Sequence, residues 1–147
     1  MIFITGGTGF LGRHLVPALC KEHIPVRVLT RKPSANMWLN QYHNVEVIAG
    51  DLLDPNIIEG AIKGCEYVIH AGGIFRFWGD EHAFMTTNRN GTQNVIRAAL
   101  NAGVKQLIHI STVAVIGDPI LMVLLMKLIQ LTPAMLINGV SGRLSKL

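Results

Sequence analysis

Charged side chains, cysteines and clusters of basic residues are all scarce in this sequence of 147 residues. Only 15% of the residues are charged and 50% are hydrophobic, so part of the surface is expected to meet a partner. The two cysteines, Cys20 and Cys65, fit no metal or redox spacing, which predicts reduced, buried thiols. Because the net charge of +4 comes from scattered Lys and Arg, nucleic-acid binding is not predicted.

A secretory signal is also missing from the first residues. A strand-like apolar run starts at Met1 and leaves no room for a basic segment, an apolar stretch and a cleavage site. Together with the reduced thiols, this predicts a cytoplasmic protein.

A glycine-rich stretch at residues 5–12, TGGTGFLG, follows the apolar run 1–4 directly. Gly6, Gly9 and Gly12 are spaced three apart, and Gly7, Gly9 and Gly12 also satisfy the general pattern G-x-G-x-x-G. An amphipathic stretch follows, as a helix requires. The order of strand, glycines and helix favours a dinucleotide site over a glycine-rich surface turn, because the first turn of a helix binds a diphosphate.

The second strand, predicted at residues 26–29, is followed by basic residues and by no acid. In a dinucleotide fold, an acid about twenty residues past the glycines holds the ribose hydroxyls, whereas a basic residue accommodates a 2′-phosphate. Here the positions are Thr30, Arg31 and Lys32. The pattern predicts NADP in preference to NAD, with Arg31 as the phosphate ligand. The alternative is a solvated basic loop.

Two further strands are predicted at residues 45–49 and 67–70, and each leads into a candidate site residue. Asp51 is either an acceptor for an adenine amino group or a turn or cap aspartate. His70 is expected to be a packed, hydrogen-bonded core histidine and not a catalyst. Ala71 and Gly72 are small enough for a cofactor to pass close by.

A fifth strand is predicted at residues 105–112, with the hydroxyls of Ser111 and Thr112 at its end as hydrogen-bond donors to a substrate carbonyl. Helices are predicted at residues 10–22, 55–63 and 81–102, with a short one around Trp38. This alternation predicts an α/β fold, a Rossmann-like doubly wound parallel sheet. The aromatic loop 74–80 indicates either a flat, apolar substrate surface or a small hydrophobic cluster.

Taken together, these residues resemble the extended short-chain dehydrogenases/reductases, the group with nucleotide-sugar epimerases, dihydroflavonol reductases and 3β-hydroxysteroid dehydrogenases. The resemblance covers residues 1–118. Its motifs are the phosphate loop with Gly6, Gly9, Phe10, Leu11 and Gly12, the adenine-contact segment with Asp51 and Leu52, the strand motif His70-Ala71-Gly72, the segment Asn88, Gly91, Thr92 and Asn94, and the strand end Ser111-Thr112.

The resemblance implies that these positions bind the cofactor, that Asn88 lies near it, and that Ser111 or Thr112 is the catalytic hydroxyl. It also implies an NAD(P)-binding domain of an oxidoreductase acting on a hydroxyl/carbonyl pair of an unidentified small molecule. Arg31 and the aromatic loop are closer to the reductases and steroid dehydrogenases. The alternatives are a non-catalytic NADP-binding sensor or interaction module, and the remnant of a nucleotide-sugar epimerase/dehydratase.

One family motif is missing. The family uses a Tyr-x-x-x-Lys pair after the fifth strand, whereas Tyr42 and Tyr67 are the only tyrosines and both precede it. The hypothesis is that an internal deletion or a misread frame removed the catalytic helix, which leaves the sheet incomplete. Residues 119–147 are then an apolar helical tail, a remnant of the substrate lobe.

The apolar run 120–137 is long enough to span a membrane. Lys127, Gln130 and Pro133 interrupt it, which favours a buried or partner-seeking helix instead. Such a surface is a candidate site for self-association.

Overall fold

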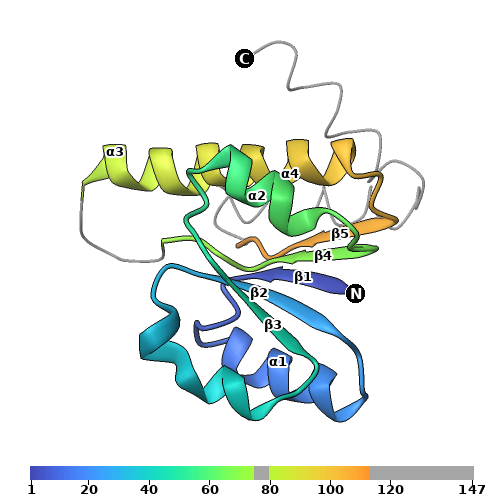
Figure 1. The fold of residues 1–147 in the computed structure, drawn as a ribbon. Helices are drawn as coiled ribbons and strands as arrows, with labels where there is room; N and C mark the ends of the chain where they lie inside the picture. Colours follow the sequence, from blue (N-terminus) through green and yellow to red (C-terminus); the bar gives the residue numbers. More distant parts are fainter. Residues whose placement is uncertain (75–79, 113–147) are drawn as a thin grey trace, which may run out of the picture. The chain divides into compact units, whose positions relative to one another are not determined.

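The computed structural model describes residues 1–74 and 80–112 and divides the chain into two compact units, Met1–Ile110 and Ser111–Leu147. The division comes earlier than the boundary at residue 118 that the sequence suggests. The first unit alternates strands and helices (Figure 1). Its elements are β1 (Ile2–Thr5), α1 (Gly12–Lys21), β2 (Val26–Thr30), η1 (Pro33–Gln41), β3 (Val45–Ala49), α2 (Pro55–Ile62), β4 (Tyr67–His70), α3 (Glu81–Phe84), η2 (Met85–Asn90), α4 (Gly91–Asn101) and β5 (Gln106–His109).

The five strands form one parallel sheet in the order β3-β2-β1-β4-β5, which confirms the doubly wound arrangement. Alternate residues of each strand face opposite layers. Phe3 and Val68 pack with α2 and α4, whereas Ile4 and Ile69 pack with α1 and η1. Figure 1 shows α2 and α4 on one face of the sheet and α1 on the other. The strand order reverses beside β1, where β2 lies on one side and β4 on the other. Parallel sheets open a ligand crevice at the carboxyl ends of the strands at such a point.

Helix α2 begins as the sequence predicts. The Asp54 side chain accepts hydrogen bonds from the backbone N–H groups of Asn56 and Ile57, at 3.0 and 3.2 Å, and Pro55 occupies the first helical turn. An aspartate cap followed by proline is a typical helix start, because proline has no N–H to leave unpaired.

Helix α1 ends in a left-handed residue that is not glycine. His23 has φ 57°, its N–H donates to the Cys20 carbonyl at 3.0 Å, and the Ile24 N–H donates to the Leu19 carbonyl at 3.0 Å. This is the Schellman arrangement. Helix α4 ends with the same pair of bonds, but with Gly103 at φ 64° in the left-handed position.

Replacing His23 with glycine should therefore raise the free energy of unfolding by about 0.5–1 kcal/mol, because glycine adopts positive φ without a Cβ clash. Urea denaturation measures the change. Glu22→Gly is the matched control, since Glu22 has φ −83° and gains nothing from glycine. A variant with His23→Gly that is less stable than the parent would contradict this explanation.

Two expectations need correction. The helix expected at residues 81–102 is helical from residue 81 to residue 101, but residues 85–90 form a π-helix between α3 and α4. Hydrophobic spacing does not reveal this π-helix. It contains Asn88, whose side chain bonds to Ile74, as described below. The fifth strand ends at His109, so Ser111 and Thr112 lie beyond it and belong to the second unit.

Candidate functional site

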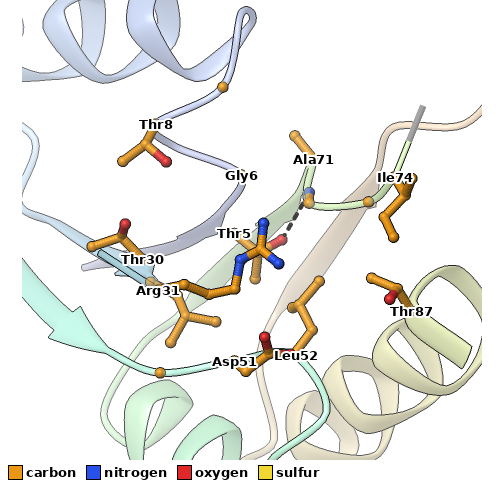
Figure 2. A pocket seen from close by; sticks show the side chains of 15 residues that line it. Thr5, Gly6, Thr8, Thr30, Arg31, Asp51, Leu52, Ala71, Ile74 and Thr87 are labelled. Carbon is orange, nitrogen blue, oxygen red and sulfur yellow. Dashed lines mark hydrogen bonds between the residues drawn. The ribbon is translucent and has the colours of Figure 1, made fainter. Parts of the chain in front are cut away.

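A cavity of about 220 Å³ lies at the carboxyl ends of the first four strands (Figure 2). The segments that follow β1, β2, β3 and β4 form its walls, together with one residue of η2. The lining residues are Thr5, Gly6, Thr8, Gly9, Leu29, Thr30, Arg31, Gly50, Asp51, Leu52, Ala71, Gly72, Gly73, Ile74 and Thr87. The cavity thus occupies the crevice that the strand order creates.

Gly6 lets the loop after β1 pass directly against the loop after β4. It has φ 71°, and a Cβ atom there would lie 2.4 Å from the Ala71 carbonyl oxygen. Gly12 is equally confined, because a Cβ atom would lie 2.3 Å from the backbone of Gly7. The glycines therefore let the loop fold against β4 and let α1 begin against the loop.

The N-terminus of α1 has unpaired backbone donors. The Gly9 N–H donates to the Gly6 carbonyl at 3.0 Å, and the Arg13 N–H donates to the Gly9 carbonyl at 3.0 Å. Within residues 1–74 and 80–112, no acceptor is paired with the N–H groups of Phe10, Leu11 or Gly12. The first turn of α1 also contains no acid and no capping side chain. A helix N-terminus of this kind favours the binding of an anion.

Arg31 directly follows β2 and lines the cavity. Figure 2 shows its side chain extending over the cavity between the glycine loop and Asp51. The ion pairs of the described residues are Arg27 with Glu46 and Lys105 with Glu66, so within that part of the chain no carboxylate neutralises Arg31. Its guanidinium can hold a second anionic group.

Asp51 forms a turn and also lines the cavity. Its Oδ1 atom accepts a hydrogen bond from the Leu53 N–H at 2.9 Å, which confirms the turn interpretation. The second carboxylate oxygen has no hydrogen bond to the described residues. The adenine interpretation therefore stays compatible with this geometry.

His70 is a core histidine, as expected. Its side chain is 1% exposed, its Nδ1 atom lies 2.6 Å from the Thr5 hydroxyl, and its Nε2 atom lies 2.9 Å from the Thr92 hydroxyl. The Thr5 hydroxyl also accepts a hydrogen bond from the Gly72 N–H at 3.1 Å. Burial, and next the nearby His109, lower the pKa of His70 to about 4, so the ring is neutral at pH 7. His70 therefore connects two strands and α4 without carrying charge.

Asn88 holds the loop after β4 from the π-helix. Its Oδ1 atom accepts from the Ile74 N–H at 2.7 Å, and its Nδ2 atom donates to the Ile74 carbonyl at 2.9 Å. Asn88 itself does not line the cavity, whereas its neighbour Thr87 does.

The structure gathers most of the expected cofactor residues at one cavity. Those that line it are Gly6, Gly9, Arg31, Asp51, Leu52, Ala71 and Gly72, whereas Phe10, Leu11, Gly12 and Asn88 do not. Phe10 is 87% exposed. The assignment of these residues to a cofactor remains a prediction.

Sequence reasoning missed several lining residues. Most of them, such as Thr5, Thr30 and Gly50, sit at or just past the ends of strands and were predictable from the rule that ligands lie at that edge. Thr87 could not be predicted, because it lies in the π-helix, which the hydrophobic spacing does not reveal.

Some expectations fall outside this site. Ser111 and Thr112 belong to the second unit, and their catalytic role remains a prediction. Residues 75–79 of the aromatic loop 74–80 and the apolar tail, with its proposed self-association, lie outside the described residues. Among residues 1–74 and 80–112, no helix is long and apolar enough to cross a membrane, and no group of three metal-binding side chains occurs.

Comparisons with known proteins agree with this geometry. A family model described as the NAD dependent epimerase/dehydratase family matches residues 2–122. The chain is 34% identical over 116 residues to a 4-hydroxy-2-methyl-3-oxo-4-farnesyl-3,4-dihydroquinoline-1-oxide ketoreductase of Stigmatella aurantiaca, covering 79% of this chain and 34% of that protein. It is 37% identical over 115 residues to the ceramide reductase of Caulobacter vibrioides, covering 78% of this chain and 35% of that protein.

A solved structure shares the fold. The Bordetella bronchiseptica enzyme WbmG, in complex with NAD, superposes with a TM-score of 0.72 at 29% identity, over 80% of this chain and 39% of that chain. The chain spans about a third of the length of the two curated relatives described above.

Proposed function

The chain belongs to the NAD dependent epimerase/dehydratase family, and from this premise we propose that its first unit binds the ADP half of NADP(H) in the cavity. The observation that carries the proposal is the start of α1. There the amides of Phe10, Leu11 and Gly12 have no acceptor in the described part of the chain, directly after Gly9 in the cavity wall. A diphosphate supplies these acceptors and is stabilised by the helix dipole.

The other walls fit the rest of an adenosine diphosphate. Arg31 lines the cavity and would bind the 2′-phosphate, and the second carboxylate oxygen of Asp51 would accept a hydrogen bond from the adenine amino group. Leu52 offers an apolar surface to the base, and the small residues Ala71 and Gly72 allow the nucleotide to approach the backbone closely.

The wider function that we propose is that of an oxidoreductase acting on a hydroxyl/carbonyl pair. Both curated relatives described above are named as reductases, which supports this reaction class. NADP(H), when bound, supplies or accepts the hydride. The hydroxyls of Ser111 and Thr112 would donate hydrogen bonds to the substrate carbonyl oxygen. Because the sequence has no tyrosine after Tyr67 to act as general acid, we expect negligible turnover from this chain alone.

Replacing Arg31 with alanine should weaken NADPH binding about tenfold and leave NADH binding nearly unchanged, because only NADPH carries the 2′-phosphate that the guanidinium binds. Titration followed by nicotinamide fluorescence measures both affinities. Lys32→Ala is the matched control, since the neighbouring Lys32 is exposed and does not line the cavity.

Tighter binding of NADH than of NADPH by the unaltered chain would rule out the role given to Arg31. It would leave the diphosphate site itself intact. Absence of binding of either nucleotide would reject the proposed function as a whole.

A further inference from the structure

We propose that Asn94 is a positioning residue for nucleotide binding, because it holds the Asp51–Leu52 wall of the cavity in place from α4. This inference rests on the proposed function. Its structural basis is the helical stretch 81–101, formed by α3, η2 and α4, which we call the brace helix.

The contact between Asn94 and Leu52 joins two segments that are 42 residues apart. The Nδ2 atom of Asn94 donates a hydrogen bond of 2.9 Å to the Leu52 carbonyl oxygen, and this bond is partly buried. Leu52 follows β3 and lines the cavity, and it belongs to the turn that Asp51 forms. The backbone at Leu52 is thus held from both sides, by its own turn and by the brace helix.

Gly91 provides a second observation at the same place. Gly91 is buried, and a Cβ atom there would lie 2.9 Å from the Cβ atom of Leu52. A side chain at residue 91 would push the wall away from the helix. The brace helix therefore touches Leu52 through a glycine at one turn and binds its carbonyl through Asn94 at the next.

The brace helix holds two more walls in the same way. Asn88 makes both of its hydrogen bonds to Ile74, which follows β4 and lines the cavity. The Thr92 hydroxyl bonds to His70, which bonds to Thr5 at the end of β1. Side chains of one helical stretch thus bond directly to the segments after β3 and β4 and to the end of β4, and they reach β1 through His70.

Rigid walls make ligand binding stronger, because the chain does not have to be ordered when the ligand arrives. Loss of the Asn94 amide leaves the Leu52 carbonyl without its donor and frees the Asp51–Leu52 wall to move. Since a single hydrogen bond of this kind changes an equilibrium by roughly five- to tenfold, a similar loss of nucleotide affinity is expected.

The test compares Asn94→Ala with the matched control Asn90→Ala in the full chain. Asn90 lies on the same helical stretch, is exposed, and makes no side-chain hydrogen bond to the described residues. Calorimetric titration with 2′-phospho-ADP-ribose and with nicotinamide mononucleotide is done well below the unfolding temperature. We expect Asn94→Ala to weaken binding of 2′-phospho-ADP-ribose five- to tenfold, with no change for nicotinamide mononucleotide and no change in either affinity for Asn90→Ala.

The outcomes separate this inference from the proposed function. If the unaltered chain does not bind 2′-phospho-ADP-ribose, the proposed function fails. If the unaltered chain binds it and Asn94→Ala binds it equally well, the positioning role is wrong, even if the variant unfolds more easily. Should Asn94→Ala fail to fold, Asn94→Asp replaces it, because aspartate keeps the volume and removes the donor. Unchanged affinity in that variant would overturn the inference just as directly.

Discussion

Replacing Gly6 with alanine is expected to lower the free energy of unfolding by about 2–4 kcal/mol, the sum of a left-handed backbone penalty and an overpacking penalty. Gly6 has φ 71°, and the added Cβ atom would lie 2.4 Å from the Ala71 carbonyl oxygen and 2.7 Å from the Gly72 nitrogen. Both atoms are backbone and cannot rotate away. The loops after β1 and β4 must therefore separate, which also widens the cavity.

Gly60→Ala is the matched control for this substitution. Gly60 lies inside α2 and an added Cβ atom would meet nothing within 4 Å, so alanine should stabilise the chain by roughly 0.5–1 kcal/mol. Urea denaturation of both variants measures the difference, and titration with NADPH at a temperature where Gly6→Ala remains folded should show weaker binding. A Gly6→Ala chain as stable as the parent would show that the two loops do not pack as described.

Lowering the pH from 6.5 to 4 is expected to remove about 3 kcal/mol of stability through His70 alone. The folded pKa of His70 is about 4, below its ordinary value of 6.5. Between these values the unfolded chain binds a proton at this ring and the folded chain does not, so stability falls as the pH falls. The loss follows from burial, because the ring lies among the hydroxyls of Thr5 and Thr92 and has no carboxylate partner in the described residues.

The difference between the parent and His70→Gln isolates this effect from the titration of other groups. The parent should lose about 1.2 kcal/mol more per pH unit than His70→Gln between pH 6 and 4.5, which corresponds to nearly one proton. His43→Gln is the control, because His43 is exposed and takes no part in these hydrogen bonds. Equal slopes for the parent and His70→Gln would mean that His70 becomes protonated while folded.

The sheet could be predicted from the sequence because each strand is a short apolar run between turn residues. The strands at residues 45–49 and 67–70 match β3 and β4, and the second strand extends by one residue, to Thr30. The same local rules placed the start of a helix at residue 55 and His70 in the core, since both depend on immediate neighbours and on burial. Asp51 illustrates the limit, because spacing left its turn role and its adenine role equally open.

The contacts that close the cavity could not be predicted, because they join residues far apart in the chain. The bonds of Asn94 to Leu52 and of Asn88 to Ile74 depend on how the brace helix crosses the ends of β3 and β4. Hydrophobic spacing fixes which face of a helix is buried but says nothing about which polar side chain reaches a loop. The π-helix at residues 85–90 was not predicted either, and it contains Asn88, the residue that makes the contact with Ile74.

The most direct test of the account follows the backbone amides of the isotope-labelled chain by NMR during a titration with NADP⁺. If the first turn of α1 binds the diphosphate, the amide signals of Phe10, Leu11 and Gly12 should shift in a saturable way, together with that of Arg31. A titration in which these four signals stay in place, while signals elsewhere move or none move at all, would contradict the proposed site.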